Sequence, residues 1–346
     1  MATNIRDVAQ IAGVSPSTVS MVLNNKKGVN PETRKRIQCI LDELNYSPEK
    51  SHTKKKRIEK VGILRYMLLE NTFIEDQIFT LSVIESLYDE CYRRGIHPSV
   101  QICNETNYID IFQKSLSEEM DALIVLCFDM DADTFDGISH IDCNGVPLVF
   151  IGNGIRDIPF NTVNLSNIED SYMAANYLYE CGYRIVGYLH SSRDFRCFRK
   201  RKYGFLSAID SLNMECPLIL SMDSQIADAE CFMTDWLKQK QLIPRAFFAD
   251  NDNLALGAIR AFESAGYKVP KDISIIGMDD LVQSAFSSVP LTTIHISRQQ
   301  ISKSALDLLL WNLSIPVHIV CRGKIVVRES TRMFDERNEP STLVCK

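Results

Sequence analysis

Between residues 61 and 277 the chain alternates short apolar runs with longer segments of helical periodicity. The apolar runs occupy residues 61–64, 99–102, 122–126, 147–152, 185–189, 218–220, 246–249 and 273–277. The helical segments occupy residues 78–94, 109–119, 168–181, 202–212, 229–240 and 253–266. Repeated strand–helix units of this kind form parallel, doubly wound sheets. We therefore predict an α/β core of two such sheets in tandem, with a ligand cleft between the two lobes at the carboxyl ends of the strands.

The first 48 residues predict a separate, all-helical unit. Apolar residues recur every three or four positions over residues 5–12, and Gly13 then permits a left-handed turn. Ser15-Pro16 and Asn30-Pro31 each combine a helix cap with a proline at the first helical position. Helix, turn, helix and supporting helix form the helix-turn-helix plan, whose second helix enters the major groove of DNA. The alternative is a three-helix interaction domain with a polar face.

The charge of the chain is divided unevenly between this head and the remainder. Residues 1–60 contain twelve Lys or Arg and six Asp or Glu, whereas the other 286 residues contain 26 and 38. A basic head on an acidic body indicates a polyanionic partner for the head alone. A solvated basic tail is the alternative interpretation.

Several protein classes lack support in the sequence. No apolar stretch reaches transmembrane length and residues 1–7 carry no secretion signal, so we expect a cytoplasmic protein without a membrane partner. The eleven cysteines include no C-x-x-C pair and the six histidines are dispersed, so we expect reduced thiols and no metal site. No dinucleotide, P-loop, metalloprotease or serine-hydrolase motif occurs, so we expect no catalytic residue, no cofactor and no enzyme activity.

Residues 5–20 closely resemble the head of LacI/GalR (lac-repressor-type) family transcription regulators, as do residues 22–24, 31–34 and 44–48. The resemblance continues through the body, for example at residues 121–125. It implies a sequence-specific DNA-binding regulator, a repressor, with a two-lobed core like a periplasmic binding protein. The resemblance further implies a homodimer that binds a near-palindromic double-stranded operator. A small-molecule effector, which could be a sugar, a sugar phosphate or a heterocycle, would control this binding.

The resemblance also implies which residues of the second helix contact DNA. The positions that usually face bases hold Pro16, Ser17 and Met21, and those that position the DNA backbone hold Thr18, Ser20 and Asn24. Met21 departs from the family, in which arginine is common at this position. Arginine can bond guanine in two places, worth about 1–3 kcal/mol of discrimination, whereas methionine offers only apolar contact. We therefore predict weak guanine readout at the base that Met21 faces.

The connector, residues 49–60, departs further from the family pattern. Family members carry a hinge helix there, with a leucine that enters the minor groove, and Lys55 holds the leucine position by our count from Pro48. Lys54, Lys55 and Lys56, followed by Arg57, suit phosphate neutralisation instead. We therefore predict an unkinked, strongly salt-dependent DNA complex. A flexible solubilising linker is the alternative, and Ile58 remains a possible wedge.

Residues 61–346 would form the effector-binding and dimerisation core. Carried over from the family, one lobe spans about residues 61–161 and 292–322, and the other spans about residues 162–291 and 323–340. Arg201, Asn251 and Asp279 match the family's cleft residues and supply donors and acceptors that suit a sugar or heterocycle. The same three residues could instead form a structural network at strand ends.

Other features of the core leave its ligand open. The family usually places an aromatic residue just after the strand that ends at residue 220, whereas residues 221–224 of this chain include none. Arg193, Arg196 and Arg199 lie in a basic segment that could bind a phosphorylated ligand or remain solvated surface. The alternative function is a constitutive DNA-binding regulator whose core binds no small ligand or responds to a protein partner.

Overall fold

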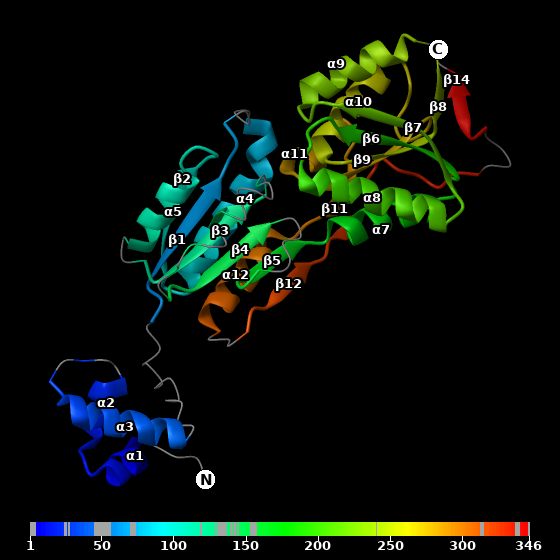
Figure 1. Ribbon diagram of the computed structural model, residues 1–346. Helices are drawn as coiled ribbons and strands as arrows, with labels where there is room; N and C mark the ends of the chain where they lie inside the picture. The colour runs from blue at the N-terminus through cyan, green and yellow to red at the C-terminus, as the bar shows by residue number, and fades with distance from the viewer. Residues whose placement is uncertain are drawn as a thin grey trace. The chain divides into compact units, whose positions relative to one another are not determined.

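The chain divides into two compact units, Met1–Arg57 and Ile58–Lys346 (Figure 1). The structure, a computed structural model, describes residues 5–23, 26, 28–44, 57–69, 74–117, 120–128, 130, 137–138, 141, 143, 145–152, 158–239, 241–311, 315–335 and 340–344. Within these ranges no helix combines the length and apolar character needed to cross a membrane.

The first unit is the three-helix head that the sequence predicts. Its helices are α1 (Ile5–Ala12), α2 (Pro16–Leu23) and α3 (Pro31–Glu43). Gly13 in the α1–α2 turn has φ +66°. Ser15 Oγ accepts a hydrogen bond from the Thr18 N–H at 3.2 Å, and Asn30 Oδ1 accepts one from the Glu32 N–H at 3.0 Å. Both predicted caps therefore form, and they start α2 and α3 where the prolines allow.

The second unit contains a first sheet of six parallel strands in the order β12-β5-β4-β3-β1-β2. Its strands are β1 (Lys60–Tyr66), β2 (His97–Cys103), β3 (Ala122–Cys127), β4 (Leu148–Gly152), β5 (Asn161–Leu165) and β12 (His318–Cys321). Its helices are α4 (Ile74–Arg93), α5 (Tyr108–Ser117) and α12 (Arg298–Leu310). Buried residues of α4 and α12 pack on one face of this sheet, and Phe112 of α5 packs on the other.

A second six-stranded sheet has the order β13-β11-β10-β9-β6-β7. Its strands are β6 (Ile185–Ser191), β7 (Glu215–Met222), β9 (Ala246–Ala249), β10 (Ser274–Asp279), β11 (Thr292–His295) and β13 (Lys324–Val326). The accompanying helices are α7 (Asn167–Glu180), α8 (Arg196–Ser211), α9 (Ile226–Leu237), α10 (Asp252–Ser264) and α11 (Val282–Ala285). α7 and α8 cover one face and α9 and α10 the other (Figure 1). A separate pair joins β8 (Leu242–Pro244) to β14 (Thr342–Val344).

The chain passes between the two sheets three times, and two of these crossings lie later than the sequence suggested. β5 belongs to the first sheet, so the first crossing follows residue 165 rather than 161. β11 belongs to the second sheet, so the second crossing follows residue 295 rather than 291. The third crossing lies between β12 and β13, at residues 322–323, where it was expected.

The sequence did not predict β5 because its buried side chains are partly polar. Thr162 and Asn164 are buried, and Asn164 Nδ2 donates to Thr162 Oγ1 at 2.8 Å. Thr162 Oγ1 is also 2.9 Å from Nδ1 of His318 on β12. These side chains satisfy one another across the strand pair, so a buried strand lacks the apolar run that would reveal it.

Candidate functional site

The second helix of the head presents a polar surface on a well-anchored scaffold. Val19 and Val22 of α2 are buried in the core of the head, whereas Pro16 and Ser17 are exposed. Thr18, Ser20 and Met21 are half-buried. Ser15 Oγ lies 2.7 Å from Ser17 Oγ and 2.8 Å from Thr18 Oγ1, so these hydroxyls form one cluster at the start of α2.

Met21 lies against the turn between α2 and α3. A Cβ atom on Gly28, which has φ +111°, would be only 3.2 Å from Met21 Cε. The end of the Met21 side chain therefore lies close to a turn of its own domain. Asn24, Lys54, Lys55 and Lys56, which the sequence also assigned to DNA contact, lie outside the described residues.

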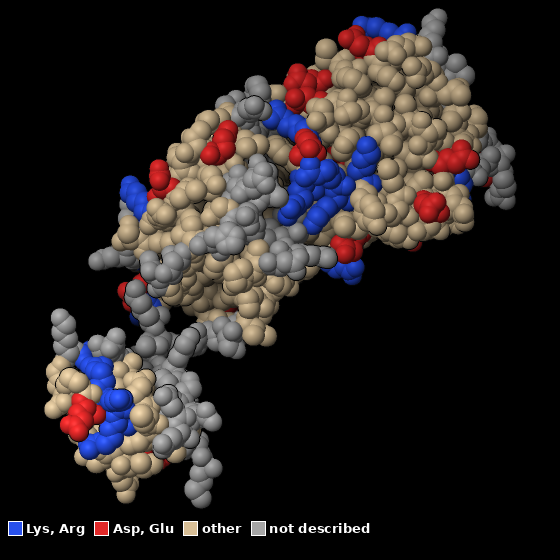
Figure 2. Space-filling model, viewed as in Figure 1, with Lys and Arg blue, Asp and Glu red and all other residues tan. Residues whose placement is uncertain are grey.

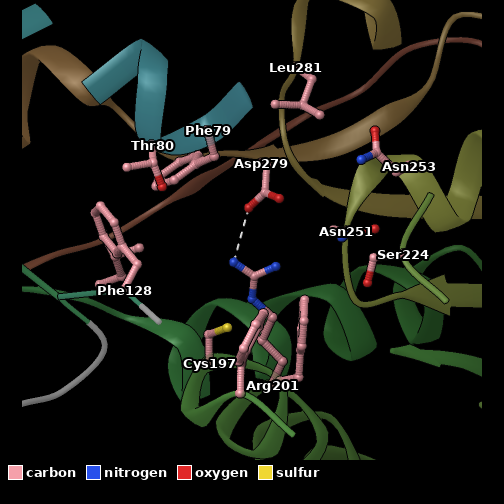
Figure 3. Close-up of a pocket in the computed structure, with 13 residues that line it drawn as sticks. Phe79, Thr80, Phe128, Cys197, Arg201, Ser224, Asn251, Asn253, Asp279 and Leu281 are labelled. Atoms are coloured by element: carbon pink, nitrogen blue, oxygen red, sulfur yellow. Dashed lines mark hydrogen bonds and ion pairs between the residues drawn. The ribbon is translucent and has the colours of Figure 1, made fainter. Parts of the chain in front are cut away.

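The candidate effector site is a cavity of about 80 Å³ in the second unit (Figure 3). Phe79 and Thr80 come from α4 and Phe128 follows β3, so these residues belong to the first lobe. The remaining lining residues are Leu165, Phe195, Cys197, Phe198, Arg201, Ser224, Asn251, Asn253, Asp279 and Leu281. The cavity therefore contacts both lobes at the carboxyl ends of their strands, as the topology predicts.

Arg201 lies at the centre of a buried polar network in this cavity. Its side chain on α8 leaves the residue only 4% exposed. Nε donates to Asn167 Oδ1 at 2.9 Å, Nη2 donates to Asp279 Oδ1 at 3.0 Å, and Nη1 donates to the backbone oxygen of Asp250. The guanidinium thus joins α7, α8 and the ends of β9 and β10, and most of its hydrogen-bonding capacity is used within the protein.

Asn251 and Asp279 line the same cavity, so the structure brings all three predicted effector residues together. Asn251 caps α10, because its Oδ1 accepts a hydrogen bond from the Leu254 N–H at 3.0 Å. The other side-chain atom of each residue, Asn251 Nδ2 and Asp279 Oδ2, has no hydrogen-bond partner within the described residues. Both residues are only 8% exposed. The cavity therefore presents one amide donor and one carboxylate acceptor to a ligand.

The backbone and the surroundings make Asp279 an unusual carboxylate. It ends β10 with φ +114°, a conformation that L residues rarely adopt and that is found at functional sites. Burial raises its pKa above the ordinary value, and the Arg201 charge acts in the opposite direction. The ion pair with Arg201 is what keeps a charge tolerable in this position.

The sequence did not identify Asp250 or the aromatic walls. Buried Asp250 accepts hydrogen bonds from Tyr188 Oη, from His190 Nδ1 at 2.6 Å and from the Ser191 N–H at 2.8 Å.

Phenylalanines from other parts of the chain supply the aromatic rings of the cavity, in place of the ring that the family usually has just after residue 220. Phe79 and Phe128 pack edge to face at 5.6 Å, and the guanidinium of Arg298 lies 4.9 Å from the Phe79 ring. The residues that did signal the site were Arg201, Asn251 and Asp279, through their match to the family's cleft residues.

Asp252 gives the core a predicted pH dependence. The residue is fully buried, and burial, followed by the nearby Asp279 charge, raises its pKa to about 7. In the unfolded chain an aspartate has a pKa of about 4. Between pH values of about 4 and about 7 the folded state therefore holds more protons than the unfolded state, so the unfolding free energy falls as the pH rises through this range. Asp252→Asn should make this fall smaller in urea titrations followed by tryptophan fluorescence, because Trp236 and Trp311 both lie in the second unit.

Exposed Asp228, on α9, supplies the control for this titration. Asp228→Asn removes a carboxyl of the same kind from a solvated site, so the slope should match that of the unsubstituted protein. An Asp252→Asn slope that also matches the unsubstituted protein would contradict the assignment.

Comparison with known proteins agrees with both units. Residues 4–49 match the family described as bacterial regulatory proteins, lacI family, and residues 175–331 match the periplasmic binding protein-like domain. The lac repressor dimer bound to operator and the anti-inducer ONPF superposes with a TM-score of 0.67 at 21% identity, covering 96% of this chain and 100% of that chain. The transcriptional regulator CelR in complex with cellobiose gives 0.65 at 22% identity, covering 94% and 99%. These structural likenesses confirm the predicted fold.

A relative of higher sequence identity carries the assignment further. The HTH-type transcriptional repressor PurR of Haemophilus influenzae (strain PittEE) is 32% identical over 316 residues, which cover 90% of each chain. The chain therefore belongs to the lacI family of bacterial regulatory proteins, as a DNA-binding transcriptional repressor with an effector-binding core.

Proposed function

We propose that this repressor binds a near-palindromic operator as a homodimer, with one α2 helix in each half-site. Pro16, Ser17 and Met21 would face bases, and the other positions of the helix would hold the phosphate backbone, namely Thr18, Ser20 and Asn24. Lys54, Lys55 and Lys56 would add phosphate contacts. The small residues at the start of α2 support this role, since Pro16 and Ser17 are exposed and permit close approach to DNA.

The effector proposed here is a small planar heterocycle bound between the lobes. The observation that carries it is a pair of atoms on two buried residues, Asn251 Nδ2 and Asp279 Oδ2, which have no partner among the described residues and face a cavity walled by phenylalanines. A ring that carries an acceptor and an N–H could pair with both atoms while its faces contact Phe79 or Phe128. About 80 Å³ is several times the roughly 10–15 Å³ that one water requires, which favours a single ring.

Control by the effector would follow from the two-lobed lining. Phe79, Thr80 and Phe128 belong to one lobe, and Arg201, Asn251 and Asp279 belong to the other. A ligand that contacts both lobes binds most tightly to one lobe arrangement, and it shifts the population of that arrangement by its differential affinity. In a dimer this shift would change the spacing of the two heads and therefore the affinity for the operator.

The test combines operator selection with an effector panel. Full-length protein selects DNA from a random pool at about 150 mM salt, and the selected operator is then titrated with nucleobases, nucleosides, pentoses and hexoses present singly. We expect one heterocycle to change operator affinity, and Asn251→Ala to remove the change without altering affinity in its absence. A sugar that acts in the same Asn251-dependent way would replace the heterocycle. If no compound acts, the constitutive regulator becomes the better description.

Met21 supplies a prediction for the same selection. The unsubstituted protein should show little guanine preference at the base that Met21 faces, because a thioether cannot donate a hydrogen bond. Met21→Arg should introduce a guanine preference of about 1–3 kcal/mol, read from the selected sequences. Met21→Leu is the control and should leave the preference weak. A strong guanine preference in the unsubstituted protein, lost in Met21→Ala, would contradict the prediction.

A further inference from the structure

A basic patch lies around the start of α8. Six of the 26 basic residues found after residue 60 fall within the ten positions 193–202, in a segment that is otherwise part of an acidic body. One of them is the buried Arg201 of the network described above, and the other five form the patch, namely Arg193, Arg196, Arg199, Lys200 and Lys202. Figure 2 shows a dense group of lysine and arginine side chains on this part of the core. Repulsion among like charges makes such a patch costly unless an anion offsets it.

The first turn of α8 is arranged against the usual rules of helix stability. Phe195 is the N-cap residue and provides no side-chain hydrogen bond, and the turn contains no acidic residue. Arg196 is the first helical residue, where a positive charge opposes the helix dipole. The Arg196 and Phe198 N–H groups have no hydrogen-bond partner among the described residues, and such a helix start beside an arginine is a favourable place for an anion.

Two arginines of the patch already have carboxylate partners, but Arg196 does not. Arg199 Nη1 lies 2.6 Å from Asp194 Oδ1, and Arg193 Nη2 lies 3.6 Å from Asp223 Oδ1. Half-buried Arg196 has no hydrogen bond or ion pair within the described ranges. The patch therefore contains one uncompensated guanidinium at the helix start.

The same turn forms part of the effector cavity. Phe195 and Cys197, the neighbours of Arg196 in the chain, both line it. An independent sign of a ligand lies in the same cavity, because Asn251 is 8% exposed and its Nδ2 has no partner within the described residues. A ligand that reaches this nitrogen would occupy the cavity beside the first turn of α8.

From this juxtaposition we propose that the effector carries a phosphate group. The ring lies in the cavity, and the phosphate lies at the rim on the Arg196 and Phe198 N–H groups of α8 and the Arg196 guanidinium. This inference rests on the proposed effector site and narrows its ligand to a phosphorylated ring compound. Arg196 then distinguishes the phosphorylated compound from its parent, since only the phosphate reaches it.

Calorimetry with matched probes tests the proposal on the full-length protein. The probes are adenosine and adenosine monophosphate, ribose and ribose 5-phosphate, and inorganic phosphate. We expect at least one phosphorylated probe to bind about tenfold or more tightly than its parent, equivalent to one charge-assisted contact. Arg196→Gln should remove this preference and leave the affinity for the parent unchanged. Arg199→Gln, one turn along the same helix and paired with Asp194, is the matched control and should retain it.

Three results would overturn the proposal. The first is that no phosphorylated probe binds more tightly than its parent. The second is that Arg196→Gln and Arg199→Gln weaken binding of the phosphorylated probe equally, which indicates a general electrostatic attraction by the basic patch rather than a specific phosphate site. The third is that Arg196→Gln weakens operator binding without any probe, which assigns the patch to DNA. The proposed function is judged separately, because Asn251-dependent binding of an unphosphorylated parent would support it whichever way the phosphate result falls.

Discussion

Replacing Arg201 by methionine should lower the unfolding free energy of the second unit by about 3–5 kcal/mol and abolish the response of operator binding to the effector. Methionine keeps much of the apolar stem but has no charge and no donor. Asn167 Oδ1, the Asp250 backbone oxygen and Asp279 Oδ1 each lose a donor within a site that is only 4% exposed. Removing one partner of a buried ion pair leaves the other charge uncompensated, which costs more than the pair contributes.

Urea unfolding followed by tryptophan fluorescence measures the first effect, and titration of the selected operator measures the second. Arg199→Met is the matched control, since Arg199 is on the same helix, 57% exposed and paired at the surface with Asp194. It should change stability by less than about 1 kcal/mol. Adding Asp279→Asn to Arg201→Met should recover part of the loss, because the carboxylate is then uncharged. A loss in Arg201→Met no larger than that of the control would show that the network contributes little.

The convergence of Asn251 and Asp279 was predictable because the ends of parallel strands place residues at one edge of a sheet, whereas Arg201 was identified through its match to the family. The wall of the cavity that the other lobe supplies was not predictable in this way. Phe79 and Phe128 come from the other lobe, and their approach depends on the angle between lobes rather than on local periodicity. Nothing in the immediate sequence of these phenylalanines separates them from ordinary core residues.

The fold was predicted where burial is apolar and was not where burial is polar. The central strands of both sheets, such as β3 and β9, are continuous apolar runs in the sequence. β5 was not identified because Thr162 and Asn164 satisfy each other in the interior. Asp250 is similar, since a single acid after a strand gains meaning only when Tyr188 and His190 reach it from β6. Polar burial depends on partners distant in the sequence, which one chain's local pattern does not contain.

Gly204→Ala, the second large effect, should destabilise the second unit by about 3 kcal/mol or more. A Cβ atom on Gly204 of α8 would lie 2.2 Å from the backbone oxygen of Ile168 and 2.8 Å from its Cα atom. The obstacle is the backbone of α7, which cannot turn away as a flexible side chain could. The two helices must therefore separate, and their shared apolar contact with the sheet is lost.

The sign of the measured change distinguishes this contact from helix propensity alone. In an unobstructed helix interior, glycine to alanine stabilises by about 1 kcal/mol, so a gain in the urea midpoint would refute the close approach. Lys202→Ala, on the same helix and half-buried, is the control and should stay within about 0.5 kcal/mol of the unsubstituted protein. Gly204 also lies one turn after Arg201, whose Nε holds Asn167 at the start of α7 at 2.9 Å. Separating the helices would stretch this bond, so Gly204→Ala should weaken the effector response even at temperatures where the protein remains folded.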